Sequence, residues 1–256
     1  MKKVWLVIFA SLLVLSSCDY FASPPTFNLD HFKAYNIKII KAEKPKDVSV
    51  QDQFIEKLVN KPITISLKKI KYFANPVNKN GEKIKDKFAH LAWYPILKDK
   101  ERKEIKYRVK YSNQFTGFKV NEIVVHKLRA LLVPSEKIIK NSKFPDKLDH
   151  YLCYQVVEGF DRAKRLTLVD QFPPEVKTAA GGPTYFCNPC SKNGKPINNN
   201  ADHLAVYVLG TGKAINKDIV IKNQFTEQSL KVEDQIFLFV PSDKSDFFPD
   251  SGQPGD

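Results

Sequence analysis

The chain of 256 residues carries one pattern four times. In each copy a histidine is followed four residues later by a tyrosine, then by a Gln-Phe step, and finally by a proline that closes the unit. The histidines are His31, His90, His150 and His203; the Gln-Phe steps begin at Gln53, Gln114, Gln171 and Gln224; the closing prolines are Pro76, Pro134, Pro189 and Pro241. Self-similarity of this kind indicates a repeat architecture made of four copies of one unit.

The four units form two pairs. The first and third share an Asp-Gln-Phe step and an Asn-Pro-x-x-Lys-Asn-Gly loop, whereas the second and fourth share Asn-Gln-Phe and a Val-Pro-Ser ending. We therefore expect two modules, residues 29–137 and 148–244, each made of two related halves. The polar segment 138–147, which contains a proline, is expected to be a linker. Residues 245–256 are expected to be a flexible tail.

Inside a unit the hydrophobic period is two. Before the first Gln-Phe step Val48, Val50 and Phe54 alternate with polar residues, and the other units repeat this alternation. Such alternation predicts a half-buried strand, and the apolar His-to-Tyr segments predict central strands. No stretch shows a helical period over ten residues. The fold class is therefore all-β, as two tandem antiparallel modules that resemble sandwiches or barrels. Turns are expected at Asn80-Gly81, Asn193-Gly194 and Gly181-Gly182.

Two cysteines occupy matched positions. Cys153 follows its histidine by three residues, and Cys187 precedes its closing proline by two. The first unit has Ala34 and Ala74 at the equivalent positions, so both thiols are present in one copy and absent in the other. Joint replacement is expected of two neighbouring side chains on adjacent strands. We predict a Cys153–Cys187 disulfide, which an oxidising compartment allows.

The spacing Cys187-x-x-Cys190 offers an alternative, because redox-active pairs have it. Redox pairs usually lie at a helix N-terminus, which lowers the thiol pKa, whereas Pro189 and the following polar residues indicate a loop that leaves a strand. A zinc site would need four ligands, and no second pair of cysteines or histidines supplies them. Cys190 is then expected to be an odd, exposed thiol, either reactive or idle.

The repeated polar residues favour structural roles over catalytic ones. One histidine per unit is expected to start a strand and bond to backbone, the alternative being a metal ligand. The four glutamines are expected to satisfy turn backbone. Asp and Asn interchange before them, which suits a turn-forming hydrogen bond and not acid–base work. We assign no catalytic, cofactor-binding or metal-binding residue and no cofactor.

The N-terminus predicts export. Residues 1–17 have two lysines and then an apolar run that is too short for a permanent membrane span, which is typical of a signal peptide. The run ends in Leu15-Ser16-Ser17-Cys18, which resembles the lipobox of bacterial lipoproteins. That resemblance implies cleavage before Cys18 and acylation of Cys18, which residues 18–28 would tether to the modules; an ordinary signal with an incidental cysteine is the alternative. Asp19 resembles an inner-membrane retention signal of some lineages. Both the inner and the outer membrane are therefore kept as alternatives for the site of anchoring.

The net charge of the chain indicates which classes of partner to expect. The chain has a net charge of +13, and removal of Lys2 and Lys3 leaves +11, from 39 basic and 28 acidic residues. Positive charge favours contact with anionic lipid or envelope polymers. Export and the scattered positions of the lysines argue against nucleic acid. We expect membrane lipid, bound through acylated Cys18, and an anionic envelope polymer or an envelope protein as partners.

The order of the motifs, H-x-x-C-Y, DQF and FCNP followed by HLxxY, NQF and VPS, resembles a bacterial domain of uncharacterised function. That domain occurs in exported and surface proteins, often in tandem, and the resemblance implies a layout without implying an activity. Two functions stay open. The first is a membrane-anchored, non-catalytic envelope lipoprotein on the exported side of the membrane. The alternative is an enzyme acting on envelope glycans or peptides, with a loop-borne site in one module.

Overall fold

The computed structural model describes residues 26–39, 46–97, 106–159 and 162–250. It confirms the all-β, antiparallel fold: thirteen strands belong to one sheet. The predicted signal peptide and Cys18 lie outside the described residues. Among the described residues the single helix is α1 (Gln53–Val59), and no helix there is long and apolar enough to cross a membrane.

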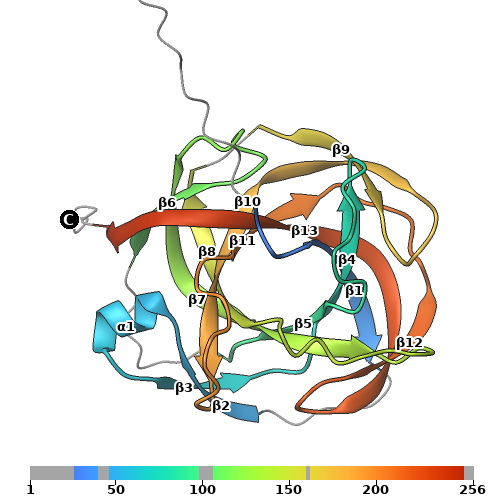
Figure 1. Cartoon of the computed structure of the whole chain (residues 1–256), viewed down its shortest axis with the longest axis horizontal. Coiled ribbons are helices and arrows are strands. Elements are labelled where there is room, and N and C mark those ends of the chain that lie inside the picture. Colours follow the sequence, from blue (N-terminus) through green and yellow to red (C-terminus); the bar gives the residue numbers. More distant parts are fainter. Residues whose placement is uncertain (1–25, 40–45, 98–105, 160–161, 251–256) are drawn as a thin grey trace, which may run out of the picture.

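Eight strands close into a ring in chain order (Figure 1). They are β1 (His31–Ile39), β4 (Tyr72–Lys79), β5 (His90–Pro95), β7 (Asn121–Lys137), β8 (His150–Glu158), β10 (Val176–Lys192), β11 (His203–Leu209) and β13 (Glu227–Pro249). Each pairs antiparallel with the next, and β13 pairs with β1 to complete a barrel. Each sequence unit therefore supplies two adjacent strands of the ring, the first starting at its histidine and the second ending after its proline.

The other strands lie outside the ring, and four of them connect opposite units. The strands outside the ring are β2 (Lys46–Gln51), β3 (Ile63–Leu67), β6 (Tyr107–Ser112), β9 (Lys164–Val169) and β12 (Lys217–Lys222). Strand β3 pairs with β2 of its own unit. Strand β2 of the first unit pairs with the end of β10 in the third, and β9 of the third pairs with the end of β4 in the first. In the same way β6 pairs with the end of β13, and β12 with the end of β7.

All four of these pairings join segment 29–137 to segment 148–249. The two segments therefore share one sheet instead of each closing a sheet of its own. The physical reason is that β2, β6, β9 and β12 each find a free hydrogen-bonding edge on the opposite unit, and an unpaired edge left exposed would be unfavourable.

The barrel interior is filled by one directly paired set of residues from each unit: Ala34 with Ala74, Trp93 with Leu132, Cys153 with Cys187 and Val206 with Phe239. The predicted Cys153–Cys187 disulfide is present, on directly paired residues of β8 and β10, and both cysteines are fully buried. In the chain-entropy model a loop of this size contributes roughly 3–4 kcal/mol to stability. Trp93 of the second unit reaches across the interior, with its ring 5.0 Å from that of Tyr185 and 6.1 Å from that of Phe239. Small pairs and large pairs thus alternate around the ring and together fill one core.

A second, larger core lies between the ring and the outer strands. It includes the tyrosine of each histidine strand and the phenylalanine of each Gln-Phe step, except that Phe225 is only partly buried. Residues from all four units contribute to it, so neither core belongs to one segment of the chain.

Three local predictions need correction. The predicted tail is ordered as far as Pro249, because residues 246–249 pair with β6 and Phe247 packs on Phe54 and Tyr107. Gly181-Gly182 is not a turn: it lies within β10, where the register shifts between Ala180 and Pro183. The first Gln-Phe step opens α1, because the Asp52 side chain accepts bonds from two backbone N–H groups as an N-cap. The predicted Asn-Gly turns are confirmed by positive φ angles at both positions of each pair.

Candidate functional site

The four histidines begin ring strands at the same end of the barrel, which we call the histidine rim. The register sets His31 opposite Val77, and the other three histidines are placed equivalently, each opposite the residue that follows a closing proline. All four are buried, and burial lowers the pKa of each to about 3. They are therefore neutral at physiological pH. The prediction that each starts a strand is confirmed. The predicted bond to backbone is present for His203, whose Nδ1 bonds to the backbone oxygen of Ala201 (2.8 Å). His150 bonds to the Gln224 side chain instead, and the two ring nitrogens of His90 have no hydrogen-bond partner among the described residues.

A lysine lies beside each histidine and joins neighbouring units. It comes three residues after each closing proline, and its Nζ lies over the phenylalanine of the next Gln-Phe step. The pairs are Lys79 with Phe115 (5.8 Å), Lys137 with Phe172 (5.0 Å), Lys192 with Phe225 (5.2 Å) and Lys244 with Phe54 (4.7 Å). These are cation–π contacts at unit junctions. Our sequence reasoning missed these lysines, although the spacing from proline to lysine repeats in all four units.

The Asp or Asn before each Gln-Phe step bridges to the opposite unit. Each side chain accepts a bond from the backbone N–H two residues later, as predicted. Each also meets the tyrosine hydroxyl of the opposite unit: Asp52 with Tyr154 (3.1 Å), Asn113 with Tyr207 (3.0 Å), Asp170 with Tyr35 (2.7 Å) and Asn223 with Tyr94 (3.0 Å). Four equivalent buried bridges result.

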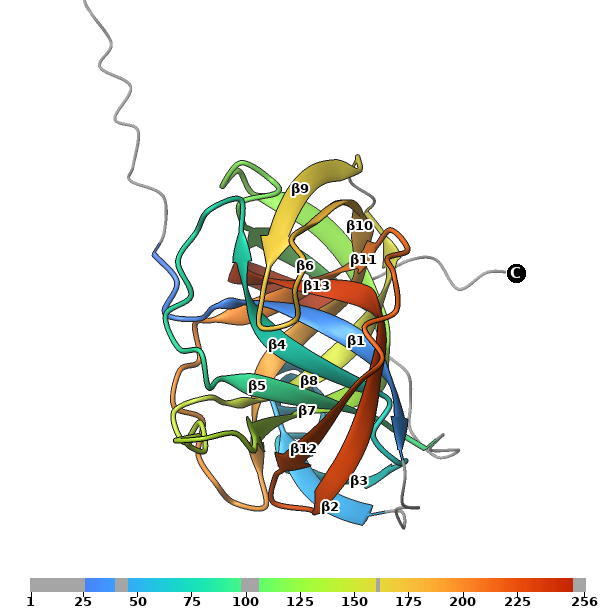
Figure 2. The ribbon, with the colours of Figure 1, turned by 90° about the vertical axis from the view of Figure 1, so that its right-hand side faces the viewer.

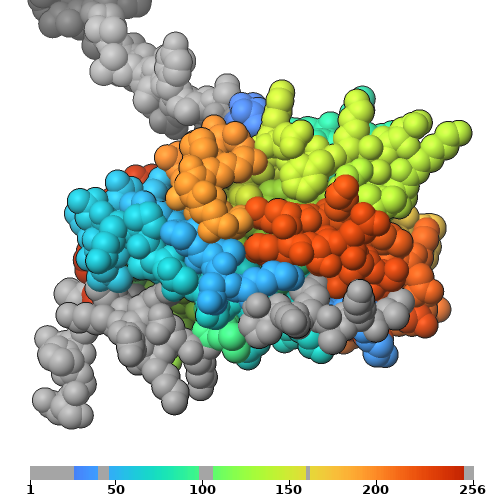
Figure 3. All heavy atoms as spheres, turned by 90° about the horizontal axis from the view of Figure 1, so that it is seen from below, coloured from blue at the N-terminus to red at the C-terminus, as the bar shows by residue number. Residues whose placement is uncertain are grey.

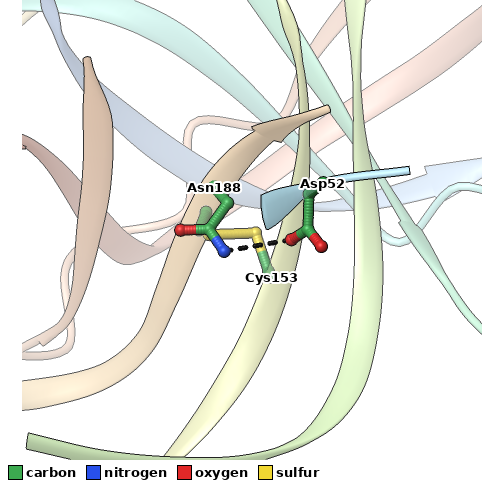
Figure 4. Close-up of a disulfide and its surroundings, with 4 residues drawn as sticks. Asp52, Cys153 and Asn188 are labelled. Carbon is green, nitrogen blue, oxygen red and sulfur yellow. Dashed lines mark hydrogen bonds between the residues drawn. A yellow bond between two sulfur atoms is a disulfide. The ribbon is translucent and has the colours of Figure 1, made fainter. Parts of the chain in front are cut away.

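The Asp or Asn of each bridge also bonds to a third side chain, and this third side chain explains why Asp and Asn interchange. Asp52 accepts a bond from Nδ2 of Asn188 (3.0 Å), close to the disulfide (Figure 4), whereas Asn113 donates to the hydroxyl of Ser242 (2.9 Å). A carboxylate only accepts and an amide also donates, so Asp suits the Asn-Pro units and Asn suits the Pro-Ser units. The alternation follows from donor–acceptor matching between opposite units.

The glutamines take different partners. Nε2 of Gln171 donates to the backbone oxygen of Lys87 (2.7 Å), which agrees with the prediction. Gln114 instead donates to the carboxylate of Glu82, and Gln224 bonds to the ring of His150. Within the described ranges no group of three or more histidines, cysteines and carboxylates is arranged to hold a metal ion.

Cys190 is buried, which contradicts the expectation of an exposed thiol. It lies on the outward face of β10, in the larger core, whereas the neighbouring Cys187 faces the barrel interior. Burial raises the pKa of its thiol well above the usual value. A buried neutral thiol is unreactive.

One bridge carries extra charge. Lys33 of β1 is buried, where the other units have Ala92, Leu152 and Ala205, and its Nζ lies 3.9 Å from the Asp170 carboxylate. Lys137 is also close to this carboxylate. Burial lowers the pKa of Lys33, and it lowers that of Lys137 to about 8, although Asp170 opposes both shifts. Asp170 is thus the shared counter-ion of two buried amines.

We expect Asp170→Asn to reduce the free energy of unfolding by about 3–5 kcal/mol, because two buried amines lose their counter-ion. Asp52→Asn is the matched control, since Asp52 has the equivalent tyrosine and asparagine partners but only Lys244 as a nearby cation. Urea unfolding at pH 7 measures both variants. Equal losses in the two would show that the extra lysine has no energetic role.

A cleft of about 390 Å³ opens beside the histidine rim at the junction of the second, third and fourth units. Its lining includes Lys137, Ile138, Ile139, Phe172, Lys217 and Ile219. Figure 3 shows this face, where the lime surface of the end of β7 and the following loop borders the orange-red surface of β12 and β13. We call it the Lys137 cleft.

Two lysines converge on one ring in this cleft. Nζ of Lys137 and Nζ of Lys217 lie 5.0 and 5.6 Å from the centre of the Phe172 ring. Phe225 has a similar pair, Lys192 and Lys46, but Asn193-Gly194 follows Lys192 where Ile138-Ile139 follows Lys137. Ile138 and Ile139 are 39% and 47% exposed. The combination of two amines with exposed aliphatic side chains is therefore specific to one junction.

Comparison with known proteins adds the family. Residues 90–240 match the model of a repeat of unknown function, DUF7450, from the first residue of β5 into β13. No curated protein and no solved structure matches the chain. The expectation of an uncharacterised repeat domain is confirmed in this respect. Because the match covers more than half of the residues, the chain belongs to the DUF7450 family of repeats of unknown function.

Proposed function

We propose that this protein is an exported lipoprotein of the bacterial cell envelope, anchored by acylated Cys18, that binds an anionic envelope ligand without chemical conversion. The observation that carries the binding role is the Lys137 cleft. Exposed Lys217 provides positive charge there, and buried Lys137 adds a second amine beside its counter-ion Asp170. Ile138 and Ile139 provide apolar contact. The lipobox-like sequence before Cys18 and the net positive charge support the location and the sign of the ligand.

Binding suits the cleft better than catalysis does. The charged side chains that line the cleft are Lys137, Lys217 and Asp218. Asp218 is exposed, whereas the next residue of β12, Ile219, is buried. At neutral pH Lys137, with a pKa of about 8, is mostly a cation. The histidines of the rim are buried, which keeps them neutral at this pH, and they are not among the residues that line the cleft. An anionic group that enters the cleft would meet donors already in place.

We expect Lys217→Glu to weaken retention on immobilised anionic envelope polymer by about tenfold, because one charge-assisted contact is lost and repulsion is added. The probes are lipopolysaccharide and peptidoglycan, tested separately in moderate salt with the protein lacking residues 1–18. Lys46→Glu is the matched control, because Lys46 holds the equivalent position over Phe225 and carries the same charge.

Equal loss in both variants would assign retention to overall charge and would contradict a role for the cleft. Release of soluble fragments from either polymer by the unaltered protein, abolished in Lys137→Met, would support the enzymatic alternative instead. No retention on either polymer would contradict the proposed class of ligand.

A further inference from the structure

The N-terminal tether leaves the barrel at the histidine rim. The backbone N–H of Asn28 donates to Oδ2 of Asp202 (3.1 Å), and the backbone oxygen of Phe27 accepts a bond from Nζ of Lys85. Residues 18–25 separate the predicted anchor from the first described residue and span at most roughly 26–29 Å when extended. Figure 2 shows the chain entering at the end where β1 begins. Under the proposed lipid anchoring, the histidine rim is therefore the end of the barrel nearest the bilayer.

Three loops at this rim carry exposed lysines. The loops are 80–89, 138–149 and 193–202, and each connects a proline strand to the next histidine strand. Their exposed lysines are Lys83, Lys85, Lys87, Lys140, Lys143, Lys147 and Lys195. Three exposed or half-buried acids, Glu82, Asp86 and Asp146, accompany them, which leaves an outward excess of four positive charges (seven minus three).

Asp30 and Asp149 beside these loops are buried and hold the loops in place. Asp30 accepts bonds from the backbone N–H groups of Lys85 and Asp86, both at 2.8 Å. Asp149 accepts equivalent bonds from Asn198 and Asn199, also at 2.8 Å. These carboxylates face the backbone, so the lysine side chains dominate what the loops present outward. Ile138 and Ile139 add exposed apolar surface beside them.

We propose that the histidine rim docks on the anionic surface of the bilayer, with the loop lysines contacting lipid headgroup phosphates and Ile138 and Ile139 lying at the interface. This inference rests on the lipid anchoring proposed above for its orientation. The length of the tether, the place where it ends and the charge of the loops all point to the same end of the barrel. Lysines near an anionic membrane surface add to binding individually, and salt screens their effect.

The test uses the protein without residues 1–18, so that acylation plays no part. We expect it to cosediment with vesicles of phosphatidylglycerol and phosphatidylcholine in equal parts, less so as salt rises, and not with phosphatidylcholine alone. The triple variant Lys83→Glu, Lys140→Glu, Lys143→Glu should lose about a hundredfold in affinity. The matched control is Lys68→Glu, Lys69→Glu, Lys71→Glu, three exposed lysines between β3 and β4 at the opposite end of the barrel, which should keep most of the binding.

Equal loss in the two triple variants would assign binding to overall charge and overturn the proposal, as would the absence of binding to the anionic vesicles. Circular dichroism and thermal unfolding verify that both variants are folded. Lys217→Glu should keep vesicle binding, because Lys217 lies outside the three loops. The two experiments therefore distinguish a failure of ligand binding at the Lys137 cleft from a failure of membrane docking at the histidine rim.

Discussion

The free energy of unfolding will rise from pH 4 to about pH 9, whereas most proteins are most stable between pH 5 and 8. On the acid side the four rim histidines are responsible. Their pKa is about 3 in the folded chain, against 6.5 for an ordinary histidine, so between these values the unfolded chain binds more protons. Each such group removes up to about 1.4 kcal/mol of stability per unit of falling pH.

On the alkaline side two lysines continue the trend, Lys137, which is buried, and Lys244, which is half-buried. The pKa of Lys137 and that of Lys244 are lowered to about 8 by burial, against 10.5 for an ordinary lysine. Between pH 8 and 10.5 these two lysines bind more protons in the unfolded chain and so favour the folded state as pH rises. Above about pH 9 the Cys190 thiol opposes them, because burial raises its pKa and the unfolded chain then ionises first. Above about pH 10 the buried tyrosines reverse the trend, since burial raises the pKa of Tyr35 and Tyr151 and the unfolded chain then ionises first.

Buried carboxyl groups oppose part of the acid loss. Burial raises the pKa of Asp30, Asp52 and Asp202, so the folded chain binds extra protons there as pH falls. Urea unfolding from pH 4 to 10 measures the balance, and His90→Gln should flatten the acid limb. His126→Gln is the control, because His126 lies outside the repeated positions. A stability maximum below pH 7 would contradict the assignment of the histidines as neutral groups.

Neither half of the chain will fold alone, and the two halves will fold when mixed. Fragments 19–139 and 140–256 each contain two complete units, yet all four outer-strand pairings and all four Asp/Asn–Tyr bridges join one fragment to the other. A single fragment would expose half of each core and several unpaired strand edges, and the conformational entropy cost would then exceed the gain from burial.

Circular dichroism and amide-proton dispersion of each fragment measure this directly. Separate fragments should give the spectra of unfolded chains, and an equimolar mixture should recover the spectrum of the intact protein. A full chain cleaved at an inserted protease site near residue 139 is the control for the break itself. Cooperative unfolding of fragment 19–139 alone would show that it is an independent module, contrary to the shared cores.

The sequence analysis predicted those features of the fold that the local sequence pattern determines. The alternation around Val48 and Val50 gave strands, the repeated histidines gave strand starts, and joint replacement gave the Cys153–Cys187 disulfide. It did not predict that opposite units interlock, because period and turn residues specify a strand but not the distant edge with which it pairs. Burial of Cys190 and the pairing of residues 246–249 were missed for the same reason. Cys190 immediately precedes the residues of β10 that pair with β2 of the first unit, and residues 246–249 pair with β6 of the second unit.

The lysines that stack on the Gln-Phe rings were visible as a repeated spacing, but their role depends on which unit lies next around the ring. The Lys137 cleft was even harder to predict from the sequence. It arises where the linker residues Ile138 and Ile139 meet β12, and nothing local to the linker indicates that neighbour.

Opposite-unit pairing also restricts how such a protein can change its number of repeats. Deleting one unit from this chain would remove the partner of the unit across the ring and leave its outer strand without an edge. A gene that encodes only two adjacent units could build the same closed wall only as a pair of chains. Growth and shrinkage of the array should therefore proceed by doubling or halving, and not by single steps as in an open solenoid.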